Sequence, residues 1–142
     1  MDWAIAHNVP HGGWCPAGRR AEDGVIPNHY DLQETDSKGY KQRTKWNVRD
    51  SDATLIISLH SELNGGSLFT QKYVNKIGKP CLHVHADSQW QAKIKAFFEV
   101  NAIQTLNVAG PRNSNAPGIE NFVYKILSNI NCNSHISQAS DR

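Results

Sequence analysis

The order of apolar and polar positions predicts a strand, a glycine turn and a helix in the middle of the chain. A short apolar run at 53–59 follows the turn-prone Asp50-Ser51-Asp52 and precedes the sequence Asn64-Gly65-Gly66. From Ser67 to Gly78 the apolar residues recur at helical spacing. Glycines let a backbone approach a ligand closely, and the first N–H groups of a helix point outward from its end. This arrangement is typical of an anion-binding site.

Two further strand–helix units follow, and together they predict an α/β fold. One strand is predicted at 81–85 with a helix after it, and another at 104–108 with a helix over 119–130. These strands are near-continuous apolar runs, which belong in a parallel sheet covered on both faces. We therefore predict a Rossmann-like, doubly wound and mostly parallel sheet flanked by helices. In such sheets ligands bind beyond the carboxyl ends of the strands.

The first third of the chain is less regular. Residues 2–8 predict a helix that is too short to be stable alone, since isolated helices of fewer than about 12 residues are marginal in water. A strand around 11–14 leads into a long loop rich in glycine and proline, and a helix over 39–49 follows. Long loops without secondary structure are uncommon in compact domains and tend to carry function.

Four groups of residues are candidates for binding a phosphorylated ligand. They are Gly65, Gly66 and Ser67 after the first apolar strand, Gly110, Arg112 and Ser114 after the last one, Arg43 near the start of helix 39–49, and the Arg19-Arg20 pair in the long loop. Arginine offers a planar fork for phosphate. Each group also has a structural alternative: a tight strand–helix turn for the glycines, a helix cap for Ser114, and solvated loop charges for the arginine pair.

Composition narrows the class of protein. The 142 residues are 39% hydrophobic and the mean hydropathy is −0.56, so we assign 1–130 to a single globular domain and 131–142 to a polar, frayed tail. The chain has no apolar run that could cross a membrane and no signal-peptide pattern, which predicts a cytoplasmic protein. The net charge of +2 is too small to suggest a nucleic-acid partner.

The residues that often carry metal or catalytic chemistry form no complete set. The three cysteines, Cys15, Cys81 and Cys132, include no Cys-x-x-Cys pair, which argues against a disulfide framework and a cysteine-based zinc site. His83 and His85 lie on one face of a strand, where two imidazoles either bind a metal or form an ordinary hydrogen-bonded pair. No nucleophile and base lie at a readable spacing, so we predict neither a catalytic residue nor a bound metal.

Several longer motifs resemble those of one family. The chain reads HGGWCPAGRRAEDGVIPNHY, then KQRTKWNVRDSDATLI, NGGSLFT, GKPCLHV and LNVAGPRNSNAPGI, over about residues 1–130. This order resembles the molybdenum carrier family, a Rossmann-like group related to the nucleotide-binding lysine-decarboxylase-like (LOG) proteins. The resemblance implies a carrier of molybdenum cofactor (molybdopterin) or of a similar phosphorylated pterin or nucleotide. It also implies that three of the groups above lie at the ligand edge: the Arg19-Arg20 pair, Gly65 to Ser67, and Gly110 with Arg112 and Ser114.

The same resemblance suggests an alternative activity and one departure. Relatives in the LOG group that cleave nucleotides carry a glutamate in the helix after the glycine motif, whereas this chain reads Ser67-Leu68-Phe69-Thr70 there. A nucleotide phosphoribohydrolase is the alternative to a carrier, and the missing glutamate argues against it. Members of the family also begin with a strand and a Gly-Gly-Gln-Thr-Gly loop, which this chain lacks before Asp2. We expect a gap near the centre of the sheet and, as a result, a homo-oligomer, either a dimer or a tetramer.

Overall fold

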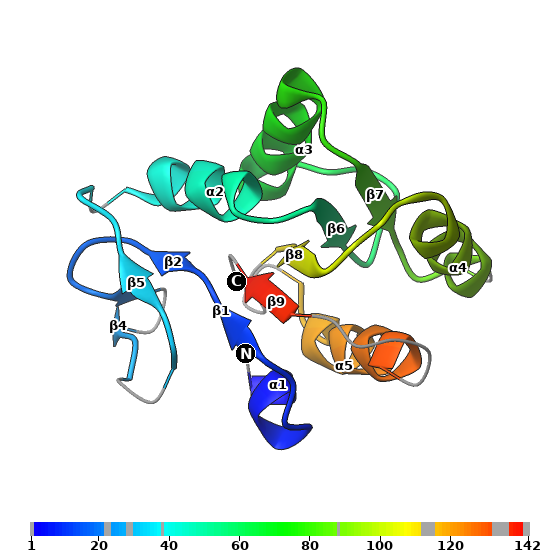
Figure 1. Cartoon of the computed structure of the whole chain (residues 1–142), viewed down its shortest axis with the longest axis horizontal. Helices are drawn as coiled ribbons and strands as arrows, with labels where there is room; N and C mark the ends of the chain where they lie inside the picture. Colours follow the sequence, from blue (N-terminus) through cyan, green and yellow to red (C-terminus); the bar gives the residue numbers. More distant parts are fainter. Residues whose placement is uncertain are drawn as a thin grey trace.

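A five-stranded parallel sheet lies between two layers of helices (Figure 1). The computed structural model describes residues 2–21, 24–27, 30–37, 39–87, 89–111, 116–131 and 137–140. The sheet has the order β1-β9-β8-β6-β7, with β1 at His11–Gly12, β6 at Ala53–Ile57, β7 at Cys81–Val84, β8 at Thr105–Ala109 and β9 at Ser137–Ser140. The helices are α1 (Asp2–Ala6), α2 (Tyr40–Arg49), α3 (Gly65–Ile77), α4 (Trp90–Val100) and α5 (Ile119–Asn131). The predicted Rossmann-like α/β architecture is confirmed.

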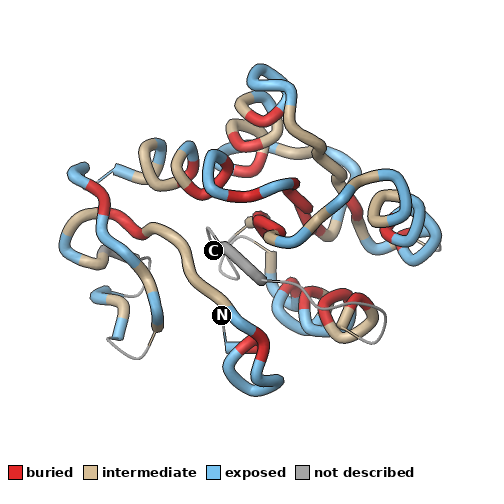
Figure 2. The backbone as a smooth tube through the Cα atoms, in the orientation of Figure 1, coloured by how far each residue is buried: buried red, intermediate tan, exposed pale blue. Residues whose placement is uncertain are grey.

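The two faces of the sheet differ in chemistry because side chains alternate along each strand. Leu55, Ile57, Leu106 and Val108 belong to the apolar core with α1, α4 and α5. The other face of the sheet is the one on the side of α2 and α3 (Figure 1). On that face, Asn107 donates to the hydroxyl of Thr54 at 3.3 Å. Figure 2 shows that burial is concentrated along the central strands and the inner sides of the helices. In the part of the chain that the structure describes, no helix is both long and apolar enough to cross a membrane.

The short helix α1 is stable because it docks on α5. Trp3 is 1% exposed, and its indole Nε1 donates to Ser128 Oγ at 2.9 Å. The indole also stacks on the ring of His7, with 4.6 Å between the ring centroids. A helix of only 5 residues is not stable through its intrinsic propensity. The burial of Trp3 therefore supplies the stability that α1 lacks on its own.

Two predictions about the sheet are wrong. The residues from 137 to 140 are not frayed: they form β9, which pairs in parallel with β8 on one side and with β1 on the other. β9 therefore fills the expected central gap. The homo-oligomer was expected because of that gap, and it stays a prediction. The single strand expected at 11–14 is divided at Gly13, whose φ of 136° turns the chain out of the main sheet.

After this division the chain enters two small sheets. β2 (Trp14–Cys15) pairs in parallel with β5 (Gln33–Glu34), and β3 (Arg20–Ala21) pairs antiparallel with β4 (Gly24–Val25). The segment predicted to be an irregular loop thus contains short strands. They form a lobe beside β1, the strand at one edge of the main sheet (Figure 1).

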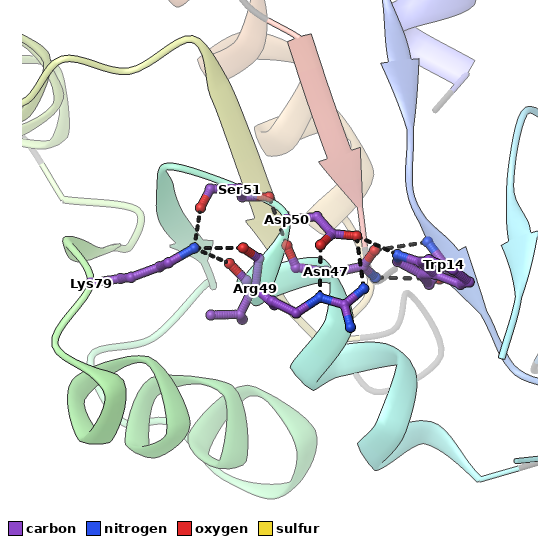
Figure 3. A network of polar contacts seen from close by, with 7 residues as sticks. Trp14, Asn47, Arg49, Asp50, Ser51 and Lys79 are labelled. Atoms are coloured by element: carbon purple, nitrogen blue, oxygen red, sulfur yellow. Dashed lines mark hydrogen bonds and ion pairs between the residues drawn. The ribbon is translucent and has the colours of Figure 1, made fainter. Parts of the chain in front are cut away.

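A polar network at the amino edge of the sheet ties the end of α2 to its neighbours (Figure 3). Lys79 Nζ donates to three backbone carbonyls, those of Val48 at 3.0 Å, Arg49 at 2.7 Å and Ser51 at 2.6 Å. The last carbonyls of a helix have no partner within it, so this ammonium group acts as a C-terminal cap. Asp50 accepts from Arg49 and from the Trp14 indole, and these hydrogen bonds hold the pKa of Asp50 below its usual value.

Asp52 lies at the same edge and fixes the start of β8. Its carboxylate accepts from the backbone N–H groups of Gln104 and Thr105, both at 2.9 Å. These two hydrogen bonds lower the pKa of Asp52. Asp50 and Asp52 are thus turn residues before β6, as the turn-prone sequence predicts.

We expect replacement of Asp52 by alanine to lower the free energy of unfolding by about 1 kcal/mol at pH 7, the usual contribution of such hydrogen bonds at an exposed site. Because the pKa is lower in the folded state than in the unfolded state, this stability is present above the unfolded pKa of about 3.9 and is lost as the pH falls through the folded value. Urea unfolding at pH 7 and at pH 3 measures this. An equal difference between Asp52→Ala and the native chain at both pH values would contradict the charge-dependent role.

Candidate functional site

A pocket of about 620 Å³ opens at the carboxyl edge of the sheet, where β6 and β8 end and where α2 and α3 begin. It lies where a doubly wound sheet places its ligands. Its volume is within the ordinary range for small-molecule sites, about 300–1,000 Å³. Five of the nine predicted ligand residues line it, namely Arg43, Gly65, Gly66, Ser67 and Gly110. The structure thus brings together three of the four candidate groups.

The first turn of α3 forms one wall of the pocket. The helix begins at Gly65, two residues earlier than the predicted start at Ser67, so the glycine pair belongs to the helix itself. Gly65 has a φ of 53°, a left-handed conformation that favours glycine. Among the described residues, no side chain caps this end: Asn64 makes no capping hydrogen bond. The first N–H groups of α3 therefore remain available for an anion.

Gly110 joins the end of β8 to the end of β6. A Cβ atom at this position would lie 2.4 Å from the carbonyl oxygen of Ile57, far inside van der Waals contact. The residue must be glycine because two backbone segments approach each other there. This close approach places the loop after β8 beside the first turn of α3, on the rim of the same pocket.

The first turn of α2 contributes a cation to the pocket. The guanidinium carbon of Arg43 lies 5.1 Å from the ring centroid of Tyr40, and both residues line the cavity. The hydroxyl of Thr44 donates to Tyr40 O at 2.9 Å, and that of Thr70 donates to Gly66 O at 2.9 Å. These two threonines therefore stabilise the first turns of the two helices that form the walls. Arg43 is the arginine of the described lining, which also contains His60.

Ser58, at the end of β6, positions the loop that closes the pocket. Its hydroxyl donates to the carbonyl of His60 at 2.6 Å and lies 2.6 Å from Nε2 of His83. A hydroxyl has one proton, so His83 is the donor in the second bond, through Nε2–H. Burial, together with His85 and Lys93, lowers the pKa of His83 and favours this neutral form. Ser58 is thus a structural residue rather than a nucleophile activated by histidine.

Arg19 of the long loop is not among the described residues that line the pocket. Arg19 donates to four backbone carbonyls of its own loop, those of Ile26, Pro27, Tyr30 and Leu32, at 2.9 to 3.2 Å. Its guanidinium therefore organises the lobe that contains β3 and β4, and the predicted phosphate contact is not what the geometry shows. The side chain of Arg20 and the whole of Arg112 and Ser114 lie outside the described residues.

His83 of β7 and His85, which directly follows the strand, have structural partners. The ring centroids of His83 and His85 are 6.0 Å apart. His85 Nε2 lies 3.4 Å from Asp87 Oδ2, and Lys93 Nζ approaches the same oxygen at 3.5 Å. Within the described ranges, no three residues of the metal-binding types are grouped so that they could hold a metal ion.

Of the two described thiols, that of Cys15 is buried and that of Cys81 is half-buried. Burial raises the pKa of Cys15, and it raises the pKa of Cys81 to about 11. A thiol is nucleophilic as its thiolate, so neither group is activated at neutral pH.

Several lining residues were not among the predicted site residues. They are Tyr40, Thr44, Ser58, Leu59, His60, Glu62, Asn64, Thr70, Pro111 and Ala116. Most follow directly from position: residues 58–64 come after the carboxyl end of β6, and Thr70 lies one helical turn from Ser67. The sequence therefore contains the signal for them, although it does not show which side chains face the cavity.

The fold and the site together define a Rossmann-like α/β protein with a small-molecule pocket at the carboxyl edge of its sheet. A family model, the circularly permuted YpsA SLOG family, matches residues 1–131. Among solved structures, the chain is similar to a "putative molybdenum carrier protein" from Syntrophus aciditrophicus SB, with 42% identity and a TM-score of 0.86 over 90% of this chain and 83% of that one. No curated protein matches. The chain belongs to the circularly permuted YpsA SLOG family.

Proposed function

We propose that this protein is a carrier that binds molybdenum cofactor, or a similar phosphorylated pterin or nucleotide, as its cargo. The observation that carries the proposal is the convergence of the α3 first turn, Arg43 and Gly110 on one pocket at the carboxyl edge. The name of the similar structure supports a molybdenum-related cargo. Oriented N–H groups and a guanidinium are the groups that proteins use to bind phosphate.

The residues present suit the two chemical parts of such a cargo. The phosphate would bind the first N–H groups of α3, with Arg43 providing the opposite charge. The ring of Tyr40, also in the lining, offers an aromatic surface for a flat heterocycle. Because Gly65 and Gly66 have open space where a Cβ would be, the ligand can approach the backbone closely at both positions.

The chemistry of the pocket favours holding a ligand over cleaving it. α3 contains no aspartate or glutamate, so the helix after the glycine pair has no carboxylate to act as a general base. In the described part of the chain, the hydroxyl of Ser58 contacts the imidazole of His83, and its proton is directed to a carbonyl oxygen. The phosphoribohydrolase alternative therefore lacks a carboxylate on α3, and Glu62, in the loop before that helix, is the carboxylate of the described lining.

Equilibrium binding of molybdenum cofactor under anaerobic conditions tests the proposal. We expect saturable binding by the native chain and a loss of about tenfold or more in affinity for Arg43→Ala, since a charged hydrogen bond is worth about 1.5–3 kcal/mol. Lys95→Ala, on α4 across the sheet, is the matched control and is expected to bind normally. Absence of binding by the native chain would contradict the carrier proposal. Sustained release of free base from AMP or GMP would show an enzyme instead.

A further inference from the structure

The positive charge of the chain is concentrated in one layer of helices. α2 and α3 together contain six lysines and arginines and no aspartate or glutamate. The helices of the opposite layer, α1, α4 and α5, contain three lysines and three carboxylates. The net charge of the whole chain is only +2, but its positive charges are concentrated in the helices on one side of the sheet.

Five of these cations are exposed, and together they form what we call the basic face: Lys41, Lys45, Arg49, Lys72 and Lys76. The three on α2 are spaced by four residues, so they follow one side of that helix. The two on α3 share the same spacing and lie beside Phe69 and Tyr73. The basic face is thus continuous across the contact between the two helices.

Aromatic rings hold the lysines of α2 in place without cancelling their charge. Lys41 Nζ lies 5.6 Å from the ring centroid of Phe69, and Lys45 Nζ lies 5.6 Å from that of Tyr73. A cation–π contact orients an ammonium group but leaves its full charge, whereas an ion pair neutralises it. In the described structure, neither lysine has a carboxylate partner, and Arg49 is the member of the face that pairs with one, Asp50 at 2.8 Å.

The basic face leads to the pocket. Both helices begin at the pocket, so the positive ends of their dipoles add to the field there. Arg43 extends the charge of α2 into the lining, where Glu62 is the opposing carboxylate among the described residues. Clefts with one dominant sign of charge raise the association rate of oppositely charged ligands by about 10- to 1,000-fold.

We propose that the basic face guides multiply charged anions into the pocket, so that the ligand is a phosphate ester or diphosphate rather than a neutral heterocycle. This rests on the proposed function, because it assigns the charge class of the same ligand. The lysines of the face need not touch the bound ligand. They accelerate its arrival, and their contribution decreases as salt shortens the screening length.

Stopped-flow fluorescence with 6-hydroxymethylpterin and its mono- and diphosphate tests the proposal. For the diphosphate at low salt, we expect Lys41→Gln/Lys45→Gln to lower the association rate constant by about fivefold while the dissociation rate constant changes by less than about twofold. The matched control is Lys95→Gln/Lys125→Gln, which removes the same charge from the opposite layer. It is expected to change the association rate constant by less than about twofold.

The outcomes separate this proposal from the carrier proposal. Loss of the difference between the two double variants at about 0.5 M salt, and a larger effect for the diphosphate than for the monophosphate, would support guidance by charge. An equal decrease for both double variants, or a decrease that persists at high salt, would overturn it while leaving the binding site intact. Failure of all three pterins to bind the native chain would count against the proposed function itself.

Discussion

Replacement of Gly110 by alanine is expected to lower the free energy of unfolding by about 3 kcal/mol. The added Cβ would lie 2.4 Å from the carbonyl oxygen of Ile57, and a backbone atom in a buried strand cannot move aside at low cost. Overpacking of this kind typically costs about 1–3 kcal/mol, and the upper end applies because β6 and β8 are the central strands. The separation of the two strand ends should also widen the pocket and weaken ligand binding.

Gly66→Ala is the matched control, since Gly66 lines the same pocket but has open space around its Cβ position. Its φ is not positive, and alanine favours a helix by up to about 1 kcal/mol over glycine, so we expect unchanged or slightly higher stability. Urea unfolding followed by tryptophan fluorescence compares the two variants. Equal stabilities of the two variants would show that the close approach of Gly110 to β6 does not require a glycine at this position.

Replacement of Lys79 by methionine is expected to lower the free energy of unfolding by about 2 kcal/mol. Methionine retains the apolar stem of the side chain but removes the three hydrogen bonds to the carbonyls of Val48, Arg49 and Ser51 (Figure 3). Hydrogen bonds that involve a charged group contribute about 1.5–3 kcal/mol, and the partial exposure of Lys79 lets water replace part of this. The last turn of α2 should unfold locally more often, because its carbonyl groups lose their cap.

The control for this variant is Lys76→Met, one helical turn earlier on α3, where the lysine is exposed. We expect that change to alter stability by less than about 0.5 kcal/mol. Amide hydrogen exchange at the end of α2 gives a local readout, which should rise in Lys79→Met only. Unchanged exchange there would contradict the capping role of Lys79.

The sequence predicts the α/β core well because its local signals agree with the tertiary structure. The apolar runs around Leu55 and Leu106 can be buried only in a sheet covered on both faces, and the glycines at 65 and 66 mark the start of the helix that follows the first of these strands. The placement of Arg43, Gly65 and Gly110 at one edge follows from the same topology. Parallel strands place all their carboxyl ends together, so the loops after them must meet.

The features that the sequence does not predict depend on contacts between distant segments. Arg19 is a loop cation in the sequence, and only the folded lobe shows that its partners are the carbonyls from Ile26 to Leu32. Likewise, residues 137–140 have no apolar periodicity. They form β9 because β8 and β1 supply backbone partners on both sides, which overrides weak intrinsic propensity.

The segregation of charge is a third feature that depends on the fold. The total of +2 argues only against a strongly basic protein. The assignment of α2 and α3 to one side of the sheet, and of α1, α4 and α5 to the other, turns a nearly neutral composition into a basic face beside the pocket (Figure 1). The positions of charged residues in a sequence predict a charged surface only when it is known on which side of the sheet each helix lies.

The central claim is that the first turn of α3, together with Arg43, binds the phosphate of the cargo in the pocket that Gly110 borders. A titration of the ¹⁵N-labelled protein with molybdenum cofactor, followed by amide chemical shifts, tests it most directly. We predict that the largest saturable shifts occur at Gly65, Gly66, Ser67 and Gly110, with smaller changes at Arg43. Shifts confined to the lobe around Arg19, or no saturable shift at the α3 first turn, would contradict the claim.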